Sequence, residues 1–271
     1  MGKFNGVLLC SDLDETLLND DKVVSKENID AIEYFKQNGG IFTFITGRTH
    51  RGIGVVLSQV EPNTIIGCLN GGSLYDHKLQ KTVMEIELSK RYVEILDFLD
   101  KNYPNIGFEV ITHEKSWICK DNHLVTRHIN IENLPRLECD YHDVPGKLGK
   151  ILLISEMEYI DEIIHAIAKL GYDDIFDFVR STRHYYEILP KNSNKGNLLK
   201  EIAKRNNIDM GRTIAAGDNN NDLQMLKYAG CGFAVANAVE DAKKAADRVT
   251  VSNNDSAIAK IIDDLDKGLI F

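Results

Sequence analysis

The stretch GVLLCSDLDETL, residues 6–17, joins a short apolar run to a pair of carboxylates. The run from Gly6 to Asp12 is bounded by polar residues, which predicts a buried β-strand. Asp12 and Asp14 come at the carboxyl end of this strand, where ligands bind in an open parallel sheet. Two ionised, unpaired carboxylates at positions i and i+2 would repel each other, and a divalent cation or a bound proton is the simplest relief. Asp-x-Asp is also a common loop sequence, so the pair needs support from elsewhere in the chain.

Alternating strand and helix signals follow this stretch. Ser25 is a candidate N-cap for a helix that runs to Gln37 and stops at Gly39-Gly40. The elements expected next are a β-prone strand, a helix and a third strand, at residues 41–46, 49–59 and 64–69. Strands separated by helices of this length predict βαβ units and a parallel sheet that is buried on both faces.

The middle of the chain differs from the first part in its composition and in its pattern of apolar residues. It contains the only tryptophan, Trp117, four of the five prolines and most of the histidines. Its alternating runs predict an antiparallel or mixed sheet with helices between the strands. The expected strands are at 82–88, 106–112 and 185–189, and the expected helices are at 89–102 and 157–170.

The strand and helix alternation resumes after this middle module. The expected elements are helix 195–206, strand 213–217, helix 222–228, strand 232–235 and helix 256–267. The sequence therefore predicts a Rossmann-like α/β parallel-sheet core of residues 1–80 and 191–271, with an inserted α/β module of residues 81–190.

Composition excludes several classes of protein. The 271 residues include 41 acidic and 32 basic ones, a net charge of −9, which argues against a nucleic-acid binder. The five cysteines are scattered without a C-x-x-C pair, so neither a zinc ribbon nor a disulfide framework is expected. No apolar run approaches the ~18 residues of a membrane span, and the first residues lack an apolar signal region. We expect a cytoplasmic protein without membrane partners, a monomer or a weak homo-oligomer.

A second group of carboxylates lies in GDNNND, residues 217–222, directly after an expected strand. Asp218 and Asp222 bring two carboxylates, and three asparagine amides lie between them. Oxygen ligands of this kind suit Mg²⁺. An asparagine-rich turn that caps the following helix is the ordinary alternative.

Two further motifs offer groups that bind anions. Thr46-Gly47-Arg48 ends the second strand, and its hydroxyl and free backbone N–H groups could hold an anion. Lys195-Gly196 opens a helix and supplies a cation. Each motif alone is ordinary, because Thr-Gly is a frequent loop pair and a lysine is usually solvated.

The four motifs together resemble those of the haloacid dehalogenase-like superfamily, in the order in which that superfamily has them. The resemblance covers the whole chain and is strongest to the Cof-type sugar-phosphatase branch, whose large α/β cap is inserted between the second and third motifs. The interval from Gly72 to Lys195 has room for such a cap. The sequence departs from the commonest first motif at Glu15, where glycine is usual.

The resemblance implies a Mg²⁺-dependent phosphatase that acts on small phosphorylated metabolites. Asp12 would attack phosphorus and form an aspartyl-phosphate, and Asp14 would act as general acid and then as general base. Asp14 can serve as an acid only if its pKa is raised, and a nearby phosphoryl dianion would raise it. Mg²⁺ would be held by the Asp12 carboxylate, the Asp14 backbone carbonyl and Asp218.

The remaining motif residues would bind the phosphoryl group or support the metal. Thr46 and the Gly47 N–H would hold phosphoryl oxygens, Lys195 would neutralise charge, and Asn221 would donate to a phosphoryl oxygen. Asp222 would act behind the metal, for instance by orienting Lys195, although Asn221 and Asp222 could exchange roles.

Other readings stay open on the sequence. A phosphomutase or phosphotransferase would use the same intermediate, and a catalytically weak phosphate-binding regulatory protein would keep the pocket. An aspartate at Asp14, where related transport ATPases carry threonine, favours hydrolysis. Substrate selectivity would lie in the cap, where the candidate contacts are Glu114, Lys115, Trp117, Arg180, Arg183 and His184, each of which could equally be a core or solvated loop residue.

Overall fold

The computed structural model describes residues 2–131 and 134–271. They form two compact units. The first, which we call the core unit, contains Met1–Arg48, Ile53–Val83 and Asn194–Phe271. The second, the inserted unit, contains Thr49–Gly52 and Met84–Ser193. In the described parts of the chain, no helix is both long and apolar enough to cross a membrane.

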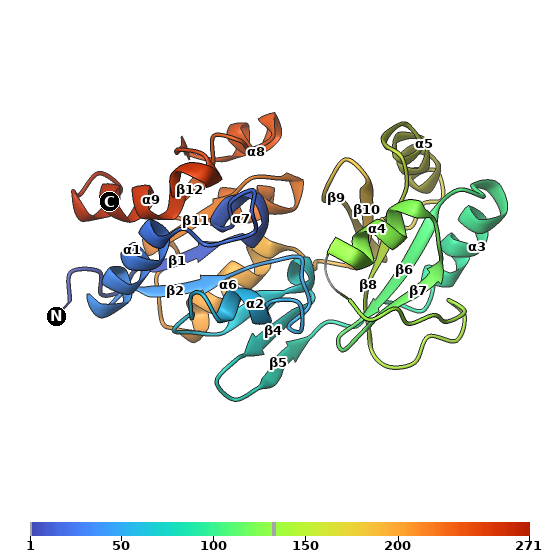
Figure 1. The fold of residues 1–271 in the computed structure, drawn as a ribbon, viewed down its shortest axis with the longest axis horizontal. Coiled ribbons are helices and arrows are strands. Elements are labelled where there is room, and N and C mark those ends of the chain that lie inside the picture. Colours follow the sequence, from blue (N-terminus) through green and yellow to red (C-terminus); the bar gives the residue numbers. More distant parts are fainter. Residues whose placement is uncertain (1, 132–133) are drawn as a thin grey trace. The chain divides into compact units, whose positions relative to one another are not determined.

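The core unit is built on a five-stranded parallel sheet (Figure 1). In sheet order, its strands are β13 (Arg248–Val249), β12 (Cys231–Ala234), β11 (Thr213–Gly217), β1 (Leu8–Ser11) and β2 (Ile41–Phe44). The register pairs Ser11 with Ala216 on one side and with Phe44 on the other. The residues that follow these three strands therefore meet at one edge of the sheet.

Helices pack around this sheet because their apolar faces need cover. They are α1 (Lys26–Gln37), α2 (Gly54–Leu57), α6 (Lys195–Arg205), α7 (Leu223–Tyr228), α8 (Glu240–Ala245) and α9 (Ala257–Asp266). Helices α1 and α9 lie against each other (Figure 1). The Ser25 hydroxyl accepts a hydrogen bond from the Asn28 N–H at the start of α1, as predicted for its N-cap.

The third strand differs from the sequence prediction. Strand β3 (Ile66–Cys68) pairs antiparallel with β4 (Ser73–Asp76), in a separate three-stranded sheet completed by β5 (Lys81–Glu85). A single parallel bridge, Ile45 to Gly67, connects β3 with the chain after β2. The expected helix at 49–59 shrinks to the four residues of α2, which turn residues precede.

The inserted unit contains an antiparallel sheet in the order β7-β6-β8-β10-β9. These strands are β6 (Gly107–Thr112), β7 (Ser116–Lys120), β8 (Leu148–Ile154), β9 (Phe176–Arg180) and β10 (Tyr185–Pro190). Helices α3 (Tyr92–Asn102) and α5 (Met157–Ala168) share an apolar core with this sheet. Helix α4 (His123–Ile131) contacts β6 and was not predicted from the sequence.

The predicted fold class, a parallel-sheet α/β core with an inserted α/β module, is confirmed.

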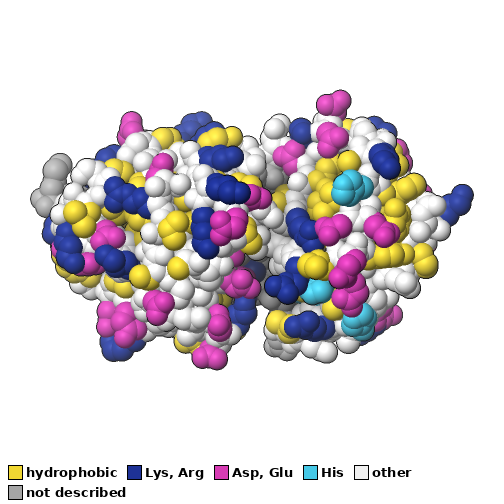
Figure 2. Space-filling view, turned by 90° about the horizontal axis from the view of Figure 1, so that it is seen from above, with side chains coloured by type: hydrophobic (Ala, Val, Ile, Leu, Met, Phe, Trp, Pro, Cys, Tyr) yellow, Lys and Arg dark blue, Asp and Glu magenta, His cyan; other side chains and the backbone are white. Residues whose placement is uncertain are grey.

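In the face shown in Figure 2, acidic and basic side chains are interspersed.

Candidate active site

Lys195 and Asp12 form a buried ion pair at the carboxyl edge of the parallel sheet. Asp12 directly follows β1, and its N–H donates to the Ala216 carbonyl oxygen at 2.9 Å. Lys195 is the first residue of α6, and its Nζ lies 2.7 Å from Oδ1 of Asp12 and 2.7 Å from Oδ1 of Asp222. The Lys195 side chain is 0% exposed, so the ordinary alternative of a solvated lysine is wrong.

Asp222 is held from both sides. Its Oδ1 accepts from Lys195, and its Oδ2 accepts the backbone N–H groups of Asp218 and Asn219 at 3.0 and 3.1 Å. A Cβ on Gly217 would lie 2.6 Å from Cβ and Cγ of Asp222, so this close approach requires glycine. The turn after β11 thus places the Asp222 carboxylate against Lys195.

Three buried carboxylates, those of Asp12, Asp218 and Asp222, come within 4.8 Å of one another. Burial, and secondarily the neighbouring Asp222, raise the pKa of Asp12 to about 7, although Lys195 acts in the opposite direction. Burial and the other two carboxylates also raise the pKa of Asp218 well above its ordinary value. The three carboxylates therefore carry more negative charge than the single Lys195 ammonium balances.

The donor set of this cluster fits a hard divalent cation. Asp12 Oδ2 and Asp218 Oδ2 accept no hydrogen bond from any residue that the structure describes, whereas Asp218 Oδ1 accepts one from the Thr16 hydroxyl at 3.0 Å. Carboxylate oxygens with spare lone pairs and unbalanced negative charge are what Mg²⁺ binds. The side chains that could hold it are those of Asp12 and Asp218.

Asp14 does not join this cluster. Arg48 Nε and Nη2 donate to its two oxygens at 2.8 and 2.7 Å, and Lys22 Nζ lies 3.2 Å from Oδ1. Burial would raise the pKa of Asp14, but the hydrogen bonds and charges of Arg48 and Lys22 prevail and lower it to about 2. In this arrangement, with no phosphoryl group beside it, Asp14 is an ionised carboxylate. The raised pKa expected of a general acid depends on a nearby phosphoryl dianion and stays a prediction.

Glu15 follows Asp14 with φ of +58°, in the left-handed region that favours glycine. Its carbonyl oxygen accepts a hydrogen bond from the Asn237 side chain at 2.8 Å. The departure from the family's first motif therefore has a conformational consequence, which the sequence alone did not reveal.

The phosphate-binding candidates lie at the same edge of the sheet. Thr46 is buried, and its N–H donates to the Gly67 carbonyl at 2.9 Å. Gly47 lies against the side chain of Asn70, whose Oδ1 accepts a hydrogen bond from Nδ2 of Asn221 at 3.1 Å. Asn70 was not among the predicted site residues, although it follows an expected strand end as Asp12 and Asp218 do.

The six candidates in the inserted unit make ordinary local contacts. Arg180 pairs with Asp161 at 2.5 Å, and Glu114 pairs with Arg51 at 2.6 Å. The His184 ring contacts the Ser155 carbonyl at 3.1 Å. Lys115 Nζ lies 5.9 Å from the centre of the Trp117 ring, whose buried Nε1 has no partner among the described residues. For Arg183, the backbone carbonyl accepts from Arg180 at 3.0 Å.

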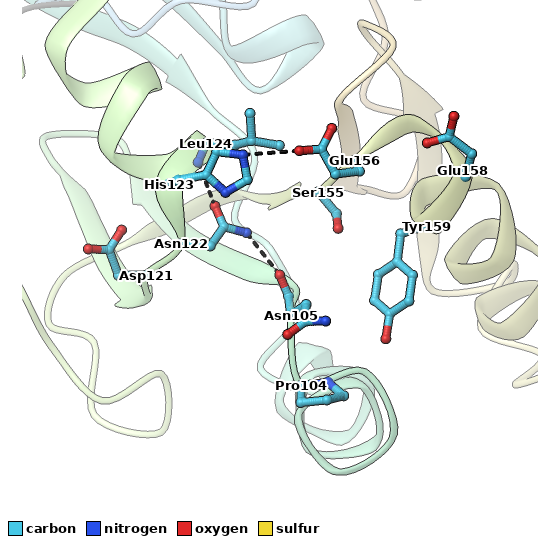
Figure 3. A pocket seen from close by; sticks show the side chains of 10 residues that line it. All are labelled: Pro104, Asn105, Asp121, Asn122, His123, Leu124, Ser155, Glu156, Glu158 and Tyr159. Atoms are coloured by element: carbon cyan, nitrogen blue, oxygen red, sulfur yellow. Dashed lines mark hydrogen bonds and ion pairs between the residues drawn. The ribbon is translucent and has the colours of Figure 1, made fainter.

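A cavity of about 450 Å³ lies in the inserted unit (Figure 3). It is lined by Pro104, Asn105, Asp121, Asn122, His123, Leu124, Ser155, Glu156, Glu158 and Tyr159. Two of its carboxylates are already paired, Glu156 with His123 at 3.0 Å and Asp121 with Arg136 at 2.6 Å. None of the motif residues lines it, so the acidic cluster at the sheet edge remains the candidate active site.

Comparisons with known proteins identify the family of this chain. A family model described as haloacid dehalogenase-like hydrolase matches residues 9–262. The 5-amino-6-(5-phospho-D-ribitylamino)uracil phosphatase YitU of Bacillus subtilis is 29% identical over 94% of this chain and 96% of its own. Phosphatase YwpJ of the same organism is 28% identical over 94% and 98%. The structure of a haloacid dehalogenase-like hydrolase from B. subtilis superposes with a TM-score of 0.82 at 26% identity, covering 95% of this chain and 99% of that one.

Proposed function

The chain belongs to the haloacid dehalogenase-like hydrolase family and is a phosphatase. We propose that it depends on Mg²⁺ and hydrolyses small phosphorylated metabolites through an aspartyl-phosphate on Asp12. The observation that carries the proposal is the buried contact of Lys195 with Asp12 beside Asp218. Phosphate monoesters hydrolyse very slowly in water, and such a cluster offers both a nucleophile and charge stabilisation.

Asp12 is the nucleophile in this proposal. Its Oδ1 is held by Lys195, which fixes the carboxylate and leaves Oδ2 available. We assign the metal to the Asp12 and Asp218 carboxylates and the Asp14 backbone carbonyl, where Mg²⁺ would neutralise the charge that otherwise keeps a carboxylate and a phosphate apart. Lys195, held in turn by Asp222, stabilises charge on the same side.

Asp14 is the proposed acid and base. It can donate a proton to the leaving alkoxide only after its carboxylate leaves Arg48 and takes up a proton. A phosphoryl dianion nearby favours both changes, because it attracts the Arg48 guanidinium and raises the pKa of the carboxyl group. The Arg48 pair therefore represents the arrangement before the substrate binds.

We assign the phosphoryl oxygens to the Thr46 hydroxyl, the Gly47 N–H, Lys195 and Asn221. The inserted module predicted from the sequence, residues 81–190, is the proposed cap that selects the leaving group. One relative is named as a phosphatase of a phosphoribityl compound, and we propose sugar phosphates or similar small phosphate esters as the substrate class for this chain.

The test is release of inorganic phosphate from an aryl phosphate and from a panel of sugar phosphates, with Mg²⁺ and with a chelator. We expect turnover that needs Mg²⁺, forms an acid-stable phosphoprotein during the reaction and disappears in Asp12→Asn. Asp247→Asn is the matched control, because the Asp247 carboxylate accepts the Gly232 N–H and lies outside the acidic cluster. Phosphate release by Asp12→Asn at the wild-type rate would contradict the mechanism. Isomerised sugar phosphates without phosphate release would indicate a mutase, and phosphate binding without any turnover would indicate a regulatory protein.

A further inference from the structure

The turn after β3 has an unusual backbone. Leu69 and Asn70 have φ values of +55° and +53°, and Gly71 follows at +121°. Both non-glycine side chains are buried, at 1% and 2% exposed. Left-handed residues occur singly in most proteins, and a leucine in this region is strained. Contacts with the surrounding structure must therefore stabilise the left-handed conformation of both Leu69 and Asn70.

Two backbone hydrogen bonds tie this turn to the Thr46-Gly47-Arg48 motif. The Asn70 N–H donates to the Thr46 carbonyl and the Leu69 N–H donates to the Arg48 carbonyl, both at 3.0 Å. In a trans peptide the C=O and N–H point in opposite directions. Since the Thr46 carbonyl points at Asn70, the N–H of Gly47 in the same peptide points away from the turn. The turn thus sets the direction of the N–H that we assign to phosphate.

The Asn70 side chain reaches two elements at once. Its Oδ1 accepts from Nδ2 of Asn221, in the turn after β11. Its amide atoms also lie 3.1 to 3.3 Å from the place where a Gly47 Cβ would be. The second amide atom of Asn221, Oδ1, is buried and has no partner among the described residues. Asn70 therefore fixes the rotation of the Asn221 amide group as well as packing against Gly47.

We propose that Asn70 is a positioning residue for phosphate, which holds the Gly47 N–H and the Asn221 amide in one arrangement. This rests on the proposed function, because it assigns both groups to the phosphoryl oxygens. The leaving group plays no part in these contacts. Loss of the Asn70 amide should therefore weaken every substrate and free phosphate by one common factor.

Asn70→Gly is the decisive variant. Glycine adopts the left-handed conformation readily, so the backbone of the turn is retained while the side-chain amide is lost. We expect the unfolding temperature to change little, because relief of the left-handed conformation offsets the lost contact with Asn221. We expect the dissociation constant of inorganic phosphate, measured by calorimetry with Mg²⁺, to rise about tenfold, the size of one lost hydrogen bond to an anion site. The ratio kcat/KM should fall by the same factor for an aryl phosphate and for sugar phosphates.

Asn207→Gly is the matched control. Asn207 also lies in the core unit with φ of +55°, but outside the motifs. We expect it to leave phosphate affinity unchanged. Asn221→Ala should weaken phosphate as Asn70→Gly does, and the double variant should lose less than the product of the two, because both changes break the same contact. This second side of the contact tests the proposal even if Asn70→Gly folds poorly.

The outcomes separate this proposal from the proposed function. Unchanged phosphate affinity in Asn70→Gly, or independent effects of the two substitutions, would overturn the positioning role while leaving hydrolysis intact. A wild-type protein that binds phosphate without turnover, with the Asn70→Gly effect present, would overturn the hydrolytic function and support the positioning role. A wild-type protein that binds no phosphate would overturn both.

Discussion

Arg48 donates two hydrogen bonds to the carboxylate of Asp14, from Nε to Oδ2 at 2.8 Å and from Nη2 to Oδ1 at 2.7 Å. Parallel hydrogen bonds between guanidinium and carboxylate are among the strongest that side chains make. The same residue that we propose as general acid is therefore held as a carboxylate, and proton transfer must begin with the opening of this pair.

Asp14→Asn tests this role through the leaving group. Loss of a general acid should lower kcat about 10²- to 10⁴-fold for sugar phosphates, whose alkoxides need a proton. The loss should be smaller for an aryl phosphate, because its phenolate leaves without one. Steady-state rates on both substrate types check this expectation. Lys22→Met, which removes only the weaker contact at 3.2 Å, should retain most of the activity. An equal loss on both substrates would contradict the acid role.

Asp218→Asn should have opposite effects with and without metal. In the metal-free protein the substitution removes one of three crowded carboxylates and should raise the unfolding temperature, since the pKa of Asp218 is raised by burial and its neighbours. The free energy of unfolding of the wild-type protein should rise by about 2.7 kcal/mol when the free Mg²⁺ concentration is about 100 times the Kd. The variant should lose most of this gain. Thermal unfolding with and without Mg²⁺ measures both effects, and an unchanged Mg²⁺ response in Asp218→Asn would exclude Asp218 as a ligand.

Glu15→Gly should stabilise the protein. Glu15 has φ of +58° and an exposed side chain, so glycine removes a left-handed strain of roughly 1 kcal/mol at little loss of contacts. Urea unfolding should show the gain in the free energy of unfolding. Glu27→Gly is the contrasting control, because Glu27 lies in the first turn of α1 and glycine there should destabilise by up to about 1 kcal/mol. A loss of stability in Glu15→Gly would contradict the strain argument.

His113 makes the inserted unit sensitive to acid. Burial lowers the pKa of His113, with Lys147 acting in the same direction and Glu85, Glu87 and the Ile86 carbonyl in the opposite one. Because the folded protein takes up this proton at a lower pH than the unfolded chain, which does so near 6.5, stability should fall as the pH drops below 6.5.

The measurement is urea unfolding between pH 7 and pH 5. His113→Gln should show a smaller pH slope than the wild type. His123→Gln should keep the wild-type slope, since the His123 side chain is 74% exposed. Identical slopes in all three proteins would refute the assignment of this acid sensitivity to His113.

Local patterns in the sequence predicted much of the fold. The apolar runs that became β1, β2, β11 and β12 report burial directly, and the Ser25 cap placed the start of α1. Because the strands of a parallel sheet all point the same way, residues that follow them meet at one edge, and the order of motifs along the chain indicated the family. The third strand forms where the sequence predicted it, but its pairing was predicted wrongly, because the sequence shows that a run is buried and not which strand it pairs with.

Side-chain pairing over long distances was decided only by the tertiary structure. Asp12 and Asp14 are the same residue type two positions apart, yet Asp12 contacts Lys195 in the buried cluster while Asp14 contacts Arg48 and Lys22. Sequence determined that carboxylates, a lysine and asparagines would gather at the sheet edge. The fold determined which of them face each other, because pKa values and hydrogen bonds depend on distances of a few ångströms that no local pattern encodes.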